Sequence, residues 1–378
     1  MSRVLIAGGG VGGATLAILL GRLGIEVELF ERGAFPREKP CGEAIMPSGT
    51  ATLERLGLTH AVGGAPFYSV RYDLRDFTLE GKFPNRNGIR IAGCGQRRIL
   101  LDATLFAIAA ATPGVSAQTG AIVEAPIIEN GRVTGLIVDG KPQRGDVVVA
   151  ADGLHSPIRK ALGLDLSPRR RRFGMRMHFR VQPGCEQPPR IDIYPRNGYE
   201  LYITPLPDGE ILVAALVEAG RIEKSAEEEF AGWLAAEPEL AEKLQGAEQL
   251  SSLAGCSPIE SRARCGVFPG CVLLGDAAGF MDPITASGLG HALATAELLS
   301  KYVAKMRRSR TDWIWQFERE RRALMRDNRI LTGAALWLAR HPRIARGAYQ
   351  AIRPTPAVFS HFISVACGAR RMWGTAAS

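Results

Sequence analysis

Short apolar runs on either side of a helical segment open the chain. Val4–Ala7 is apolar, a run of small and aliphatic residues follows a glycine-rich turn, and a second apolar run ends at Glu31. Two short apolar strands separated by one helix are typical of a βαβ unit with parallel strands. The pattern therefore predicts such a unit over residues 2–32.

Alternating apolar and polar positions dominate the middle of the chain. Residues 68–91 and 173–218 alternate over long runs, and residues 121–151 form short apolar segments separated by Glu-Asn-Gly and Asp-Gly-Lys. Period-two alternation is typical of antiparallel strands with one covered face, and these tripeptides are typical of hairpin turns. Helical periodicity predicts amphipathic helices over residues 98–111 and 225–244.

The last third of the chain is mostly helical in pattern. An apolar strand meets a glycine turn at residues 272–279, and a helix is predicted over Gly288–Met306. After Asp312 the helical pattern is interrupted only at His341-Pro342 and Arg353-Pro354 and ends near Gly368. A further short helix is predicted over residues 49–56.

These elements predict an α/β fold in which a Rossmann-like domain is interrupted by a mostly antiparallel β-sheet domain and followed by C-terminal helices. The expected boundaries are 1–67, 95–165 and 255–330 for the Rossmann-like domain, 68–94 and 166–254 for the inserted sheet domain, and 331–378 for the C-terminal helices.

The turn after the first strand reads Gly8-x-Gly10-x-x-Gly13, and the second strand ends in Glu31. Gly8 permits a tight turn, Gly10 allows a pyrophosphate to approach the backbone, and Gly13 allows the helix to pack on the strand. The helix N-terminus favours anions, and the Glu31 carboxylate can accept hydrogen bonds from ribose hydroxyls. In this context the motif predicts dinucleotide binding, without distinguishing FAD from NAD.

Composition adds limits to this picture. The 378 residues are 46% hydrophobic, which is enough for a large core. No apolar stretch is long enough to span a bilayer, and the first apolar run lacks the basic start and cleavage site of a signal peptide. Seven cysteines without a Cys-x-x-Cys or Cys/His grouping suggest no zinc site and a reduced, cytoplasmic setting.

The net charge of +9 comes largely from Arg169–Arg172 and from Lys301–Arg346. No nucleic-acid-binding module accompanies these residues, so we expect no nucleic-acid partner. The remaining interpretations are a solvated basic face or attraction of an anionic cofactor, an acidic substrate or an anionic membrane surface.

Three further motifs follow in order along the chain. Arg98 opens a helix, and Asp152-Gly153 follows the apolar strand Val147–Ala150. The segment from Gly275-Asp276 through Asp282-Pro283 to Gly288-Leu289-Gly290 leads from a strand through a loop to a new helix. Ligands of α/β sheets bind where strands end, and the new helix N-terminus is a second site that favours negative charge.

With these motifs in this order, the chain resembles the FAD-dependent oxidoreductases of the p-hydroxybenzoate hydroxylase fold, which include aromatic monooxygenases, geranylgeranyl reductases and flavin-dependent halogenases. The resemblance spans about residues 3–310 and implies an FAD site. It implies that the glycines hold the pyrophosphate, that Glu31 and Arg32 lie at the adenosine ribose, and that Arg98 and Asp276 lie at the ribityl region. The implied flavin-binding positions are completed by Asp152, Pro283, Gly288 and Leu289.

The resemblance also places the loop from Lys39 to Gly49 beside the flavin ring. Cys41 is either a reactive thiol there or a small packing residue, and Cys41, Glu43 and Pro283 are the candidates for a catalytic role. Tyr199 and Tyr202 are candidates for substrate contact on the alternating sheet, with simple packing as the alternative.

The leading functional prediction is an FAD-dependent monooxygenase that uses NAD(P)H and O₂ on an aromatic or polyketide-like small molecule, with or without an alkyl tail. The main alternative is a reductase of isoprenoid or other lipid C=C bonds. A halogenase and a non-enzymatic flavin-binding module are also considered. Geranylgeranyl reductases show the pattern Tyr-x-Trp-x-Phe-Pro, and tryptophan-type halogenases show Trp-x-Trp-x-Ile-Pro. At the corresponding residues 200–205 of this chain, only the middle aromatic residue, Tyr202, and the proline, Pro205, are present. Oligomeric state and membrane contact are left open.

Overall fold

A six-stranded sheet carries the N-terminal βαβ unit in this computed structural model, which describes residues 3–61, 63–306 and 313–372. The predicted unit is confirmed as β1 (Arg3–Ala7), α1 (Val11–Arg22) and β2 (Glu26–Glu31). The strand order is β10-β2-β1-β14-β24-β23, and all neighbours are parallel except the last pair. The added strands are β10 (Val115–Thr119), β14 (Val147–Ala150), β23 (Val267–Phe268) and β24 (Cys271–Leu273).

Helices α1, α2 (Pro47–Arg55), α3 (Arg98–Ala111) and α7 (Gly288–Met306) share an apolar core with this sheet. The predicted helix over residues 98–111 is confirmed as α3, and α7 is confirmed as well. Both contact α1, and α2 contacts α7. The short helix begins two residues earlier than predicted, because Pro47 is well suited to the first helical position. These helices and the sheet enclose one large apolar core.

An antiparallel three-stranded sheet lies beside the parallel one, with β11 (Val123–Glu129), β12 (Arg132–Val138) and β13 (Lys141–Arg144). Both predicted hairpin turns are present, and their Asn-Gly and Asp-Gly pairs adopt positive φ. The chain returns from this sheet through β14 to α4 (Pro157–Ala161).

The predicted antiparallel sheet is the largest in the molecule. Its order is β20-β16-β19-β18-β17-β5-β6, with β21 paired to β16, and only the β17–β5 pair is parallel. The strands are β5 (Ser69–Asp73), β6 (Thr78–Lys82), β16 (Arg172–Arg180), β17 (Ile191–Pro195), β18 (Tyr199–Pro205), β19 (Glu210–Glu218), β20 (Glu248–Gln249) and β21 (Ala254–Cys256). We call it the eight-stranded sheet.

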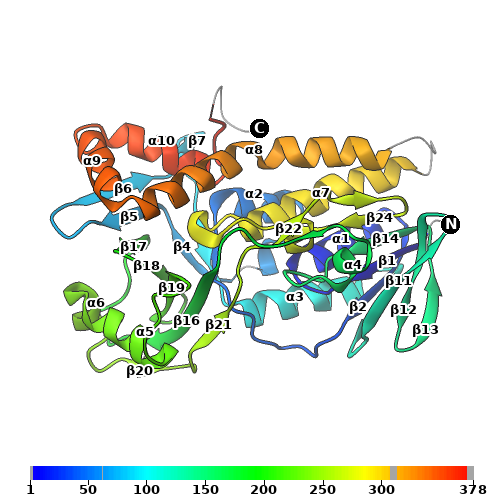
Figure 1. The fold of residues 1–378 in the computed structure, drawn as a ribbon, viewed down its shortest axis with the longest axis horizontal. Helices are drawn as coiled ribbons and strands as arrows, with labels where there is room; N and C mark the ends of the chain where they lie inside the picture. Colours follow the sequence, from blue (N-terminus) through cyan, green and yellow to red (C-terminus); the bar gives the residue numbers. More distant parts are fainter. Residues whose placement is uncertain (1–2, 62, 307–312, 373–378) are drawn as a thin grey trace.

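Helices cover both faces of the eight-stranded sheet (Figure 1). Phe230, Trp233 and Leu240 of α5 (Ala226–Ala235) and α6 (Pro238–Lys243) pack on one face. The single helix predicted over residues 225–244 was therefore wrong. Pro238 lacks the N–H that helix continuation needs, and it starts a second helix instead.

The C-terminal helices cover the other face. They are α8 (Trp313–Arg340), α9 (Pro342–Ile352) and α10 (Pro356–Ala366), with breaks at both predicted proline sites. Helix α8 runs from the six-stranded sheet, where Glu318 accepts the Gly266 N–H, to the core under the eight-stranded sheet, where Leu336 is buried. The predicted start of this region at Asp312 lies outside the described residues. Within the described residues, no helix combines the length and apolarity needed to cross a bilayer.

Small elements connect the two main sheets. The remaining elements are β3 (Ala44–Ile45), β4 (Ala65–Phe67), β7 (Asn85–Arg86), β8 (Ile89–Arg90), β9 (Gly93–Gly95), β15 (Asp165–Leu166), β22 (Arg262–Ala263) and the 3₁₀ turns η1 (Thr59–Ala61), η2 (Gly275–Ala278) and η3 (Pro283–Thr285). The strands of the eight-stranded sheet come from two separate stretches of sequence, as expected, while the domain boundaries themselves stay predictions.

Candidate functional site

Glycines allow α1 to approach the ends of β1 and β14 closely. Gly8 has φ of +105°, and a Cβ there would lie 2.3 Å from the Ala151 carbonyl oxygen. A Cβ on Gly13 would lie 1.9 Å from the Gly8 carbonyl oxygen. Neither space admits a side chain because the obstructing atoms belong to the backbone.

Gly10 differs from these two glycines because it faces open space. It is the N-cap of α1, no side chain caps this end, and the nearest atom to a Cβ would be Arg37 Nη2 at 4.0 Å. The N–H groups of Val11 and Gly12 have no hydrogen-bond partner among the described residues. The helix end therefore offers free donors and partial positive charge to an anion.

Glu31 is buried beneath this turn. Its carboxylate accepts the N–H groups of Gly9 and Gly33, both at 2.9 Å, and Arg37 Nη2 lies 3.2 Å away. Arg37 also lies over the Phe35 ring, and its buried Nε has no partner. The guanidinium of Arg37 is thus held beside the glycine turn with a donor left unused.

Arg32, the predicted companion of Glu31, is exposed and makes no hydrogen bond within the described residues. Its role at the ribose stays a prediction. Arg37 was missed because it lies in an irregular loop, where no periodicity distinguishes one arginine from another.

The loop that contains Arg37 continues to the N-terminus of α7. Lys39 Nζ lies 3.8 Å from the Asp276 carboxylate, and the Thr204 hydroxyl donates to the Gly42 carbonyl at 3.0 Å. A Cβ on Gly49 would meet the Gly290 backbone at 3.3 Å. This loop, residues 37–49, therefore links the glycine turn, Asp276 and the start of α7.

Arg98 is tied to two acids beside this loop. Its Nε and Nη2 each donate to Asp102 at 2.7 Å, and its backbone N–H donates to Glu43 at 2.9 Å. Burial alone would lower the pKa of the Arg98 guanidinium, but Asp102 and Cys41 raise it. Cys41 is half-buried and accepts the Glu43 N–H at 3.4 Å. Arg98 is therefore a permanent cation, and its contact with the ribityl region stays a prediction.

Glu43 belongs to a buried polar network that sequence reasoning did not find. Its side chain is fully buried at a φ of +55°, and its carboxylate lies 2.8 Å from His178 Nε2. Because a carboxylate only accepts, Nε2 carries the hydrogen and donates. The other nitrogen, Nδ1, lies 3.1 Å from Ser251 Oγ and 3.2 Å from Arg176 Nη1.

Arg176 connects this network to the surface, where it pairs with the exposed residue Glu38. Arg176 and His178 are two residues apart on β16, so they face the same side. The alternating pattern of this strand contained that information, but nothing in the sequence pointed to Glu43 as their partner.

Asp152 and Asp276 both follow strand ends, as predicted. Asp152 Oδ2 accepts the Ile158 N–H at 3.3 Å, whereas its buried Oδ1 has no partner, and burial raises the pKa of this carboxyl. The backbone carbonyl of Asp276 accepts a hydrogen bond from the Ser261 hydroxyl at 2.7 Å. The side-chain carboxylate of Asp276 faces Lys39.

The N-terminus of α7 is a second helix end without a side-chain cap. Asp282 accepts the Ile284 N–H and so fixes Pro283 at the start of η3. The Ser287 hydroxyl donates to Asn328 of α8 rather than capping α7, and the Leu289 side chain is buried in the core. The backbone N–H of Leu289 has no partner among the described residues.

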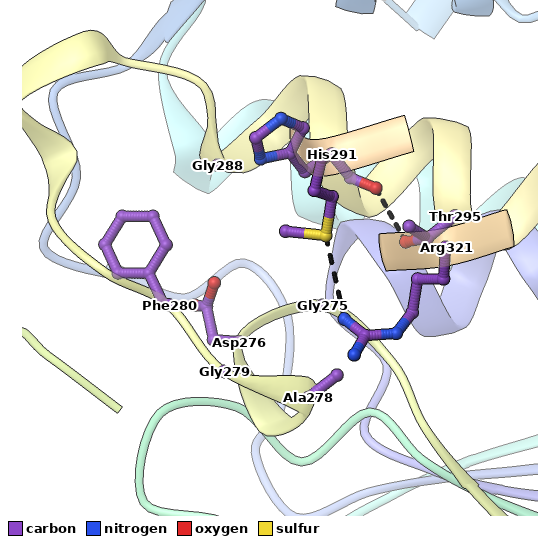
Figure 2. Close-up of a pocket in the computed structure, with 10 residues that line it drawn as sticks. Gly275, Asp276, Ala278, Gly279, Phe280, Gly288, His291, Thr295 and Arg321 are labelled. Carbon is purple, nitrogen blue, oxygen red and sulfur yellow. Dashed lines mark hydrogen bonds between the residues drawn. The ribbon is translucent and has the colours of Figure 1, made fainter. Parts of the chain in front are cut away.

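A small pocket lies beside Asp276 and contains His291 and Arg321 in its lining (Figure 2). Burial, assisted by Arg321, lowers the pKa of His291 to about 4. The imidazole is therefore neutral at physiological pH and does not serve as a proton donor there.

Tyr199 and Tyr202 lie on opposite faces of β18, since they are three residues apart in a strand. Tyr199 stacks on Trp233 of α5 at 4.9 Å, whereas Tyr202 belongs to the core beneath the C-terminal helices. The two side chains therefore cannot contact one substrate from the same face of the sheet, and substrate contact by either of them stays a prediction.

Tyr202 belongs to a buried polar cluster inside that apolar core. Its hydroxyl donates to Glu200 at 3.0 Å, and Arg172 bridges Glu200 at 2.7 Å and Asp282 at 2.8 Å. Burial raises the pKa of Asp282 to about 6, although Arg172 lowers it. We call Arg172, Glu200, Tyr202 and Asp282 the arginine cluster; it adjoins Pro283 through Asp282.

These features fit an FAD molecule. A pyrophosphate suits the open space at Gly10 and the unused Arg37 Nε. A ribityl chain or flavin ring suits the loop 37–49 and the uncapped end of α7. The orphaned Asp152 oxygen likewise lies at a strand end where ligands bind.

Comparison with known proteins agrees with this fit. Residues 1–329 match the family described as FAD binding domain. A 6-methylpretetramide 4-monooxygenase from Streptomyces rimosus is 33% identical over 171 residues, which cover 43% of this chain and 40% of that protein. A salicylate hydroxylase from Pseudomonas putida is 27% identical over 338 residues, which cover 79% of this chain and 76% of that protein. A menaquinone reductase from Mycolicibacterium smegmatis is 24% identical over 316 residues, with 79% and 75% covered.

The matches to the first four relatives, all monooxygenases, span only 33% to 40% of those proteins' lengths. Among solved structures, a flavoprotein/dehydrogenase from Cytophaga hutchinsonii has a TM-score of 0.85 at 20% identity and covers 97% of this chain and 92% of that one. The flavin-dependent halogenase CmlS has a TM-score of 0.79 at 22% identity and covers 92% and 70%. At these identities the structures establish the fold alone.

Proposed function

This chain belongs to the FAD binding domain family, and from that premise we propose that it is an FAD-dependent monooxygenase. The substrate class is an aromatic or polyketide-like small molecule, and NAD(P)H is the electron donor. Bound FAD supplies the electron transfer and oxygen activation that no side chain provides.

The chain's own residues bind and orient in this proposal. The end of α1 and Arg37 hold the pyrophosphate, with Gly8, Gly10 and Gly13 giving the backbone its close approach. The loop from Cys41 to Glu43, with Pro283, Gly288 and Leu289, forms the surroundings of the flavin ring. The C-terminal helices exclude water from the core below the eight-stranded sheet.

The observation that carries the substrate class is the arginine cluster in an otherwise apolar region. Its surroundings include Met46, Phe67, Ile193 and Phe359. Charged and hydroxyl groups are costly to bury unless they are used in hydrogen bonds. Arg172 Nε is buried without a partner, so an aromatic substrate with a hydroxyl or carbonyl oxygen gains a hydrogen-bond donor there, whereas a plain hydrocarbon chain gains none.

A lipid C=C reductase is the second candidate. It is supported by the menaquinone reductase match, which covers 79% of this chain, the same share as the salicylate hydroxylase match. The apolar core under the C-terminal helices also suits a lipid-like substrate.

Oxygen consumption distinguishes the two candidates. We expect the FAD-loaded protein to consume O₂ with NADPH or NADH, and an aromatic probe such as salicylate or a hydroxylated naphthalene to raise the rate at least about tenfold. The product should carry one oxygen atom from labelled O₂. Anaerobic reduction of an isoprenoid C=C bond, without aromatic hydroxylation in air, would overturn the monooxygenase and support the reductase.

A further inference from the structure

The chain from residue 331 to residue 372, which includes the end of α8 and all of α9 and α10, carries basic side chains and no acidic ones. Residues 331–372 contain six arginines and no lysine, aspartate or glutamate, so they contribute +6 to a chain whose net charge is +9. Helices α8, α9 and α10 contact one another and lie together on one side of the molecule (Figure 1). We call the exposed side chains of α8 from Ile330 onward, of α9, of α10 and of residues 367–372 the C-terminal surface.

Large apolar side chains are exposed on the same surface. Of the twelve exposed large hydrophobic residues in the described part of the chain, five lie on this surface: Ile330, Trp337, Ile344, Val358 and Phe362. Ile330 and Trp337 are two helical turns apart on α8, so they share a face, and Val358 and Phe362 share a face of α10. All four are 42% to 52% exposed, and α9, which carries Ile344, has no buried residue.

These exposed residues are not needed to hold the helices in place. Leu336 of α8 and Phe359 and Ile363 of α10 face inward and are buried. Ile363 packs where Gly81 of β6 leaves room for it. The outer apolar positions therefore form a separate face that is free for another surface.

The arginines are only partly neutralised within the chain. Arg340 pairs with Glu218, and Arg346 pairs with Asp76. Arg343 and Arg370 make no ion pair among the described residues. The C-terminal surface thus has cations available for an external anion.

We propose that the C-terminal surface docks on a bilayer that contains anionic lipids. Amphipathic helices with arginines beside tryptophan and aliphatic residues lie in the membrane interface, with the cations at the headgroups. Anionic headgroups attract such a basic segment. The inference stands independently of the proposed reaction.

The charge pattern argues against other occupants. A second copy would bring arginines against arginines, because a two-fold contact uses the same surface twice. A nucleic acid would match the charge. Its bases stack on aromatic side chains, however, and gain nothing from exposed aliphatic ones such as Ile330, Ile344 and Val358.

Vesicle co-sedimentation of the full-length, FAD-loaded protein tests the proposal. We expect it to bind vesicles of phosphatidylcholine mixed with phosphatidylglycerol at least about tenfold more than vesicles of phosphatidylcholine alone, and added salt to weaken the binding. Protein that stays in the supernatant with both vesicles would overturn the proposal.

Matched variants locate the contact. The double substitutions Trp337→Ser/Ile344→Ser and Arg343→Glu/Arg370→Glu are each expected to reduce binding at least about tenfold. The controls Ile122→Ser/Ile128→Ser and Lys141→Glu/Lys160→Glu, exposed elsewhere, should bind as the wild type does. Thermal unfolding and FAD content confirm that each variant is folded.

Three results would contradict this assignment. The first is equal vesicle binding by the wild type and by Trp337→Ser/Ile344→Ser. The second is a dimer in light scattering that this variant dissociates, which would make a second copy the occupant. The third is displacement from vesicles by duplex DNA at stoichiometric amounts, which would make a nucleic acid the partner.

Discussion

Gly13→Ala is expected to prevent formation of the native turn between β1 and α1. The added methyl group would lie 1.9 Å from the Gly8 carbonyl oxygen, and neither the helix nor the strand can move without disturbing the core. We expect a loss of more than about 3 kcal/mol in the free energy of unfolding and loss of bound FAD. Chemical denaturation and the flavin content of the purified protein measure both effects.

Gly12→Ala is the matched control one residue earlier. A Cβ at Gly12 meets Ala292 and Leu274 side chains at 3.6 Å, which is an ordinary contact. Alanine also favours the helix by about 1 kcal/mol over glycine. The control should therefore be at least as stable as the wild type. Wild-type stability and full flavin content in Gly13→Ala would show that the close packing of α1 on the turn is wrong.

Arg98→Met is expected to destabilise the protein by about 3–5 kcal/mol, because it removes both side-chain hydrogen bonds from the fully buried Asp102 carboxylate and leaves it only Arg37 Nη1 at 3.7 Å. The measurement is the urea dependence of unfolding. Arg32→Met is the matched control, since Arg32 is exposed and makes no hydrogen bond within the described residues.

The double variant Arg98→Met/Asp102→Leu separates the two roles of Arg98. Removing both charges should restore much of the lost stability, since an apolar pair replaces the ion pair. If FAD affinity recovers with stability, Arg98 acts only through the fold. If affinity stays low in the stable double variant, the guanidinium contributes to cofactor binding as predicted from the sequence. A single variant as stable as the wild type would contradict the burial of this pair.

Local patterns predicted most of the fold. The βαβ unit, the helix at residues 98–111 and the C-terminal breaks depend on periodicity, glycine and proline, which act within a few residues. The division at Pro238 was missed because the acidic helical pattern continues across it. A proline can open a helix as well as end one, and only the packing of both helices distinguishes these outcomes.

The candidate site was predictable where one segment builds it and less so where distant segments meet. The glycine turn and the strand-end acids are local motifs. The pairs Glu43–His178 and Arg172–Asp282 join residues more than one hundred positions apart. The positions of Tyr199 and Tyr202 could have been predicted from the sequence. Side chains alternate between the two faces of a strand, so two residues three positions apart lie on opposite faces.

The central claim is that the open end of α1 holds FAD, and titration of the apoprotein with FAD tests it most directly. Gly10 faces open space, so Gly10→Ala should fold normally while its methyl group obstructs the pyrophosphate. We expect FAD to bind Gly10→Ala at least about tenfold more weakly than the wild type, about 1.4 kcal/mol, with unchanged thermal unfolding of the apoproteins. Gly12→Ala should bind within about threefold of the wild type. Equal FAD affinity in Gly10→Ala and the wild type, or no FAD binding by the wild type, would contradict the account.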